Sequence, residues 1–126
     1  MRFFISIQKK LQSPVINLDN LKVLSKDNPA FIKEILQVYL ENAPLDFNKL
    51  KDHAAKEDWT MVRYYAHKLK SSSFTIGFND GYSAFQSIER IIKNQEGIDP
   101  IPELINTADR LCQNSFSEVK DALKNY

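Results

Sequence analysis

The sequence predicts an all-α protein, an antiparallel four-helix bundle with a short additional N-terminal helix. Apolar residues recur at spacings of three and four along most of the chain, as they do on one face of an α-helix. No convincing strand-like alternation occurs beyond residues 1–7. Short segments join the four longer helical stretches, which favours antiparallel neighbours.

The length and composition are those of one globular domain. The chain has 126 residues, of which 43% are hydrophobic and 26% charged, enough to bury a core without disulfides. Seventeen basic and sixteen acidic residues leave a net charge of +1, so neither a nucleic acid nor a membrane is indicated as a partner. A single cysteine suits a reducing compartment, and the N-terminus is too briefly apolar for a signal peptide. We therefore expect a cytoplasmic monomer.

The pattern divides the chain into an N-terminal extension at residues 1–16, whose structure it does not specify, and a helical domain at 17–126. A short helix around residues 18–26 leads into this domain. The three glycines form no phosphate-binding loop, and Cys112 and the two histidines lack the spacing of a metal site. We expect no metal or nucleotide site of its own.

The first long helix begins after Asp27 or Asn28, either of which can cap it, with Pro29 at its first position. Pro44 lies within the pattern and predicts a kink or a break near Asn42–Ala43. The stripe expected to face the core consists of Ile32, Leu36, Tyr39, Ala43, Phe47, Leu50 and Ala54.

Asp58 is the expected N-cap of the next helix, which ends at Gly77. Its stripe consists of Trp59, Val62, Ala66, Leu69 and Ser73. A fourth helix begins at Asn79 and ends before Gly97, with a stripe of Tyr82, Phe85, Ile88 or Glu89, and Ile92. The last helix follows residue 99 or 101 and carries Leu104, Ala108, Leu111, Ser115, Val119 and Ala122.

His67 lies next to the buried stripe of its helix. It follows Ala66 by one residue, about 100° around the helix, and should therefore face outward. Lys68 is adjacent, and the residues three and four positions away form the rest of its surroundings: Arg63, Tyr64, Lys70 and Ser71. The sequence thus predicts an exposed ridge of basic residues around His67.

Such a ridge has a chemical use. Neighbouring cations disfavour a further positive charge, and a neutral imidazole is a competent nucleophile. The same cations suit a phosphoryl group, and the small Ser71 leaves room for a partner protein. The alternative is an ordinary solvated histidine among lysines, which is how we interpret His53, a residue with no such ridge.

The run AHKLKSSSFTIG resembles the signature of histidine-containing phosphotransfer (HPt) domains. The matching residues are Ala66, His67, Leu69, Lys70, Ser71, Ser72 and Gly77. An Ile88–Glu89 pair stands at the distance where the family often has an apolar residue followed by Glu or Gln, and the resemblance covers about residues 17–125. Two positions depart from the family pattern. Ser71 replaces a frequent glycine, and Gly81 replaces an apolar residue, which loses a packing contact and about 1 kcal/mol of helix stability.

The resemblance implies that His67 accepts a phosphoryl group from a receiver-domain aspartate and passes it to another receiver in a phosphorelay. Partners would be receiver domains of response regulators or hybrid histidine kinases, which also supply Mg²⁺. Arg63, Lys68, Lys70 and Ser71 would support the phosphoryl group and the partner, with Tyr64 and Phe74 as candidate docking residues. Phe74 fits the core equally well. The protein would be a phosphocarrier and not an enzyme acting alone.

Two other functions fit the same residues. An HPt-like module could bind a receiver or kinase without transferring phosphate. An independent enzyme could use His67 as a general base, but such a base needs an orienting acid. The nearest acids along the chain, Glu57, Asp58 and Asp80, are all distant in sequence from His67.

Overall fold

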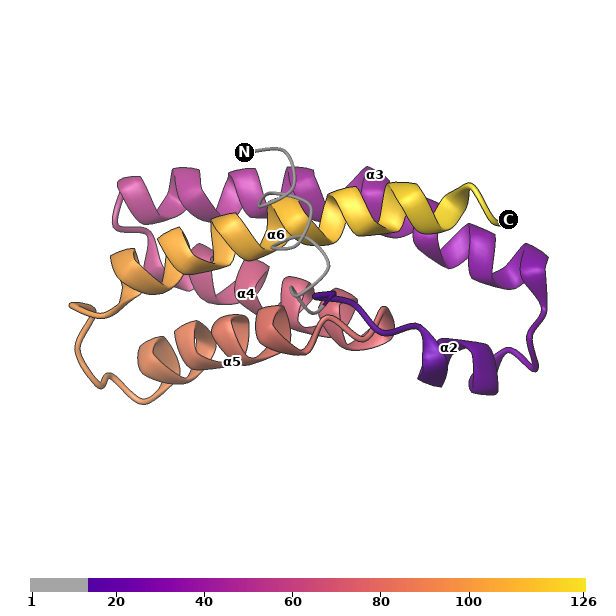
Figure 1. Ribbon diagram of the computed structural model, residues 1–126. Coiled ribbons are helices and arrows are strands. Elements are labelled where there is room, and N and C mark those ends of the chain that lie inside the picture. The colour runs from indigo at the N-terminus through magenta and orange to yellow at the C-terminus, as the bar shows by residue number, and fades with distance from the viewer. Residues whose placement is uncertain (1–13) are drawn as a thin grey trace, which may run out of the picture.

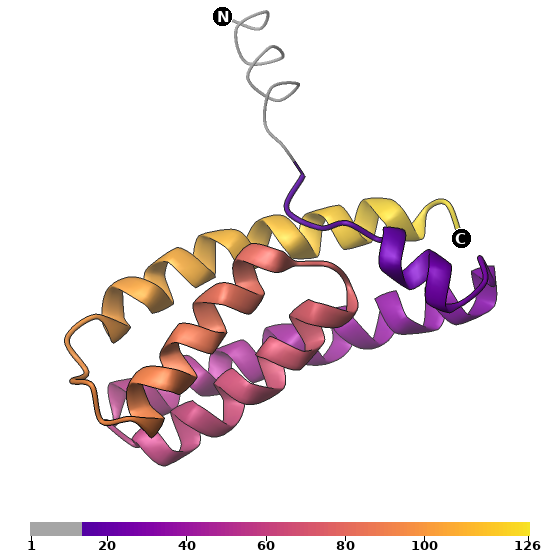
Figure 2. The same cartoon turned by 90° about the horizontal axis from the view of Figure 1, so that it is seen from below.

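The computed structural model describes residues 14–126, which form five helices and no strand. A short helix α2 (Asp19–Leu24) precedes four long ones: α3 (Pro29–Ala55), α4 (Trp59–Thr75), α5 (Asn79–Lys93) and α6 (Ile101–Leu123). The long helices run back and forth as an elongated bundle with α2 at one end (Figures 1 and 2). The predicted all-α bundle with an additional short helix is confirmed. None of these helices combines the length and the apolar character that crossing a bilayer requires.

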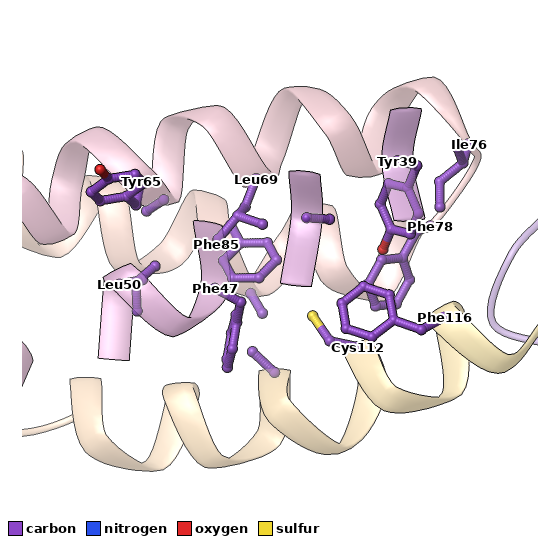
Figure 3. Packing of buried hydrophobic residues seen from close by; sticks show 14 of the residues in the cluster. Tyr39, Phe47, Leu50, Tyr65, Leu69, Ile76, Phe78, Phe85, Cys112 and Phe116 are labelled. Atoms are coloured by element: carbon purple, nitrogen blue, oxygen red, sulfur yellow. The ribbon is translucent and has the colours of Figure 1, made fainter. Parts of the chain in front are cut away.

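The four long helices enclose a single core. Each packs against the next along the chain, and α6 closes the ring against α3. Figure 3 shows side chains from these helices meeting in a common interior, where Phe47 packs edge-on against Phe85 and Tyr39 lies against Phe116. The predicted stripes are largely buried. The stripe residues that remain partly exposed lie at the margins of the core: Ala54, Trp59, Tyr82, Ile92, Leu104, Leu111 and Ala122.

The helix boundaries follow the predicted caps. The Asn28 side chain accepts hydrogen bonds from the backbone N–H groups of Ala30 at 3.1 Å and Phe31 at 3.3 Å, and Pro29 takes the first helical position. The Asp58 side chain accepts one from the N–H of residue 61 at 3.3 Å. Each cap satisfies donors that the first turn of a helix leaves unpaired. Asn28 is thus the cap of α3.

α3 passes through Pro44 without interruption, so of the two predicted outcomes near Asn42–Ala43 the break is excluded and the kink remains. The ribbon changes direction along α3 instead (Figure 1). Proline deprives the Leu40 carbonyl of its usual partner. Both Leu40 and Pro44 line a surface hollow of about 480 Å³ between α3 and α6. On the inner side of the same helix, Ala43 and Phe47 are buried in the core, and this packing on both sides of Pro44 favours a continuous helix.

Two glycines on either side of the α4–α5 turn permit close packing. Gly77 has φ +67°, and a Cβ there would collide with the Asn17 backbone carbonyl, so glycine is required. Gly81 lies inside α5, where a Cβ would collide with the ring of Phe78, itself fully buried. The expected loss of packing at Gly81 is therefore wrong, because the Phe78 ring fills the space of the missing side chain.

The segment before α2 is fastened to the bundle at two points. The backbone N–H groups of Val15 and Ile16 donate to the two carboxylate oxygens of Glu118 on α6, at 2.9 and 3.1 Å. The N–H of Asn17 donates to the carbonyl of Gly77 at 3.1 Å. Residues 15–17 thus bridge α6 and the α4–α5 turn. The rest of the predicted extension, residues 1–13, lies outside the described part, and the boundary at residue 17 stays a prediction.

Candidate functional site

α4 has one buried and one open side, and His67 lies on the open one. Ala66 and Leu69 are almost completely buried, whereas the His67 side chain is 63% exposed. The outward orientation predicted from the helical spacing is confirmed.

A carboxylate from the neighbouring helix contacts the His67 ring. Nδ1 of His67 lies 3.3 and 3.2 Å from the two carboxylate oxygens of Glu89 on α5. One of these oxygens also lies 3.1 Å from the Lys70 ammonium, and the Glu89 side chain is only 17% exposed. Sequence reasoning did not place Glu89 in the site, although the Ile88–Glu89 pair was the signal that could have done so. The argument that His67 has no orienting acid is therefore wrong.

The proton on the His67 ring can be assigned from this contact. Burial alone would raise the pKa of Glu89, but the hydrogen bonds from Lys70 and His67 outweigh it and lower the pKa below its ordinary value. Glu89 is therefore ionised near neutral pH, and an ionised carboxylate only accepts hydrogen bonds. Nδ1 of His67 must accordingly carry a proton. In the neutral ring this leaves the free electron pair on Nε2, away from Glu89.

The ring borders a shallow surface hollow of about 430 Å³, lined by Thr60, Arg63, Tyr64, His67 and Glu89. Arg63 is exposed and Tyr64 is 53% exposed. The structure thus brings two of the predicted site residues, Arg63 and Tyr64, to the same opening as His67.

The two lysines near His67 pair with carboxylates of different helices. Lys70 is 21% exposed and pairs with Glu89 on α5. The Lys68 ammonium lies 3.2 Å from a carboxylate oxygen of Asp46 on α3, and this hydrogen bond raises the pKa of Lys68. An exposed ridge of basic residues was expected here. Lys68 is exposed, whereas Lys70 is partly buried, and carboxylates of α3 and α5 engage both lysines.

Ser71 and Phe74 continue the open side of α4. Ser71 is exposed, one turn beyond His67. Phe74 is 69% exposed, and its ring centroid lies 6.0 Å from that of Tyr82. Phe74 is therefore not a core residue, and of its two interpretations only the exposed one remains.

His53 sits in a different environment near the end of α3. Its side chain is 27% exposed, and its ring stacks on Tyr65 with centroids 5.8 Å apart. Nδ1 lies 3.4 Å from a carboxylate oxygen of Asp58, but the geometry is not that of a hydrogen bond. The expectation of a solvated histidine is wrong here, since the ring is half-buried and packs against α4.

Two solved structures share this fold. The HPT domain from the Hpt sensor hybrid histidine kinase from Shewanella is 23% identical, with a TM-score of 0.75 over 89% of this chain and 96% of that one. Histidine-containing phosphotransfer protein B (HptB) from Pseudomonas aeruginosa PAO1 is 18% identical, with a TM-score of 0.75 over 91% of this chain and 99% of that one. At such identities the likeness shows the fold alone.

Among curated proteins, none matches significantly. The family model described as Hpt domain matches residues 34–125, which include most of α3, all of α4 and α5, and His67. The chain therefore belongs to the Hpt domain family, whose members are phosphocarrier modules of histidine phosphorelays.

Proposed function

We propose that this protein carries a phosphoryl group on Nε2 of His67, accepting it from a receiver-domain aspartate and passing it to another receiver. The observation that carries this proposal is the His67–Glu89 contact. Glu89 holds Nδ1 on the bundle side, while the ring is 63% exposed and presents Nε2 to an approaching partner.

No proton leaves the imidazole ring during the transfer step. The Nε2 electron pair attacks phosphorus as the bond from phosphorus to the aspartyl oxygen breaks, and that oxygen keeps the bonding pair. The Nδ1 proton stays in place, so the phosphorylated ring becomes a cation. The Glu89 carboxylate lies against this side of the ring and stabilises the positive charge as it develops.

The neighbouring residues divide the remaining tasks. Arg63 lines the same hollow as His67 and supplies a cation for the phosphoryl oxygens. Lys70 is close to Glu89 and adds a second positive charge. The small side chain of Ser71 leaves room for the partner to approach the His67 ring. Tyr64 and Phe74 offer aromatic surface to the partner. Lys68, which pairs with Asp46 on α3, supports the partner on that side of α4.

We propose that Mg²⁺ comes from the receiver and that the domain works as a carrier, not as an enzyme alone. Within residues 14–126, no three His, Cys, Asp or Glu side chains are grouped so as to hold a metal ion. Removing Mg²⁺ should therefore stop transfer from a receiver, while phosphorylated His67, once formed and separated, should keep its label in a chelator.

Hpt domains interact with receiver domains. We propose that these receiver domains belong to response regulators or hybrid histidine kinases.

A cytoplasmic monomer that binds neither nucleic acid nor membrane completes the proposal. The near-neutral net charge of +1 supports the absence of polyanionic partners. The single cysteine, Cys112, is buried, and burial raises the pKa of its thiol to about 12, which keeps it unreactive. A free thiol of this kind suits a reducing compartment.

The test is phosphotransfer from a panel of purified receivers carrying labelled aspartyl phosphate. The parent protein and His53→Gln should take up label, and His67→Gln should take up none. The adduct should be labile in acid and stable in base, as phosphoramidates are. Equal labelling of His67→Gln would refute the site. A receiver that binds the parent protein yet keeps all of its label would favour the binding-only module.

A further inference from the structure

Glu89 offers the His67 ring a full negative charge, not merely a hydrogen-bond acceptor. Both of its oxygens lie within 3.3 Å of Nδ1, and the carboxylate is only 17% exposed. A partly buried charge acts through a lower effective dielectric than a solvated one, so its effect on a neighbouring proton is larger. This effect should persist after the ring is phosphorylated, because Nδ1 is not the atom that reacts.

The Nδ1 proton decides how easily a phosphorylated ring releases its phosphoryl group. When an acceptor oxygen attacks phosphorus, the P–Nε2 bond breaks and its electron pair returns to Nε2. If Nδ1 keeps its proton, the leaving group is a neutral imidazole. If Nδ1 has lost it, the leaving group is an imidazolate anion, which is far more basic and departs slowly.

The charges around the ring favour the protonated form. Glu89 contributes one negative charge and the phosphoryl group about two more. Lys70, 3.1 Å from Glu89, and Arg63, in the same hollow, oppose them with two positive charges. Lys68 is held by Asp46 on α3. Thr60 and Tyr64 line the rest of the hollow. The balance is about one negative charge, and removing the Glu89 charge would cancel it.

We propose that Glu89 keeps phosphorylated His67 protonated on Nδ1, so that the phosphoryl group is carried in a short-lived, readily released form. The inference rests on the proposed function and concerns the lifetime of the intermediate. Glu89 acts through His67 and is a positioning residue. In each release the acceptor oxygen gains phosphorus, Nε2 regains its electron pair, and the proton stays on Nδ1.

The experiment compares Glu89→Gln with the parent in a His53→Gln background, so that only His67 can carry phosphate. Glutamine keeps the shape and an acceptor oxygen but not the charge. Phosphoramidate, which phosphorylates imidazoles directly, loads both proteins without a receiver. Loss of the phosphoryl group is then followed from pH 5 to 9, and the Nδ1 protonation of phosphorylated His67 is followed by ¹⁵N NMR.

Loss of the charge should move the protonation midpoint of the phosphorylated ring about one pH unit lower and lengthen its half-life about tenfold on the alkaline side. Glu96→Gln is the matched control. Glu96 follows the end of α5 and pairs with Arg90 at 3.3 Å, so the same substitution there removes a paired carboxylate that does not contact His67. This variant should behave like the parent.

An unchanged half-life and midpoint in Glu89→Gln would overturn the inference and leave the proposed function intact. The reverse case is distinguishable as well. If no receiver ever labels the parent protein, the proposed function fails, while the chemically loaded protein still decides what Glu89 does.

Discussion

The two sides of α4 are built from one continuous stretch of sequence and differ in nearly every physical respect. The inner side places Val62, Ala66, Leu69 and Ser73 in the core with almost no exposed surface. The outer side leaves Tyr64 half exposed, His67 at 63% and Phe74 at 69%. The polar contacts of His67 and Lys70 reach across to α5.

This difference separates stability from chemistry along one helix. Inner residues contribute by excluding water and filling volume, so their replacement costs folding free energy. Outer residues are free of that role and can serve a partner. The two histidines show the same division. His53 stacks on Tyr65, whereas His67 is held at one nitrogen and exposes the other.

The largest effects should come from placing the same large side chain on each side of α4. Ser71→Trp on the outer side should fold normally yet lose transfer from a receiver by about 100-fold or more, because the reacting atoms must come within about 3.5 Å. Ser73 is 1% exposed, and Ser73→Trp should overpack the core and cost about 3 kcal/mol or more. Circular dichroism and labelled-receiver assays check both variants. Unimpaired transfer through Ser71→Trp would mean that the partner approaches from elsewhere, and Ser71→Ala should stay active.

A second pair removes side chains instead. Leu69→Ala should lower the free energy of unfolding by about 2–5 kcal/mol, since Leu69 is 2% exposed. Phe74→Ala should change it by less than about 0.5 kcal/mol and weaken receiver binding about tenfold. Urea unfolding and titration calorimetry separate the two effects. A large loss of stability in Phe74→Ala would place that ring in the core after all.

Lys70 lies at the border between the two sides. Lys70→Ala should slow phosphotransfer about tenfold, a loss of about 1.4 kcal/mol of transition-state stabilisation. The unfolding free energy should fall by no more than about 1 kcal/mol, because the pair with Glu89 is partly solvated. Rapid-quench kinetics and thermal unfolding measure the two quantities. Normal transfer with a large drop in stability would make Lys70 purely structural.

A smaller difference in stability is expected between variants of the two histidines. His53→Ala should cost about 1 kcal/mol of stability, because it removes a half-buried ring stacked on Tyr65. His67→Ala should cost less than about 0.5 kcal/mol, as exposed substitutions usually do. Guanidinium unfolding of both variants measures the difference, and equal costs would remove the distinction drawn between the two sites.

The smallest expected effect is the pH dependence of the Glu89 pairing. The pKa of Glu89 is lowered from its ordinary value of 4.5, so the folded protein binds this proton less tightly than the unfolded one. The stabilisation is complete above pH 4.5 and is lost as the pH falls through the lowered pKa. Parent and Glu89→Gln should therefore differ by less than about 1 kcal/mol at pH 7 and converge once the pH has fallen below the lowered pKa of Glu89. A difference that grows towards low pH would reverse the assigned sign.

The helices and the outward face of His67 followed from sequence because both depend on local rules. Asn28 and Asp58 cap helices through neighbouring backbone groups, and the position of His67 next to Ala66 fixes its direction. Whether α3 continues through Pro44 or breaks there did not follow, because it depends on how the side chains around the proline pack against the other helices.

The Glu89 contact was missed for a related reason. It joins residues on two helices, and their meeting depends on how α5 is rotated in the bundle. The stripe of α5 allowed either Ile88 or Glu89 to face inward. The structure buries Ile88, which leaves Glu89 at the seam with α4. The lysines were misjudged in the same way, since Asp46 and Glu89, their partners, lie on other helices.

The two-point fastening of residues 15–17 has a mechanical consequence. The chain is tied to α6 by Glu118 and to the end of α4 by the Gly77 carbonyl before it reaches α2. A pulling force applied ahead of Val15 is thus borne first by these hydrogen bonds, and α2 carries none of it until they break. In a single-molecule pulling experiment, Glu118→Ala should lower the force of the first rupture. Tension on the chain would then act on the turn that follows the helix carrying His67.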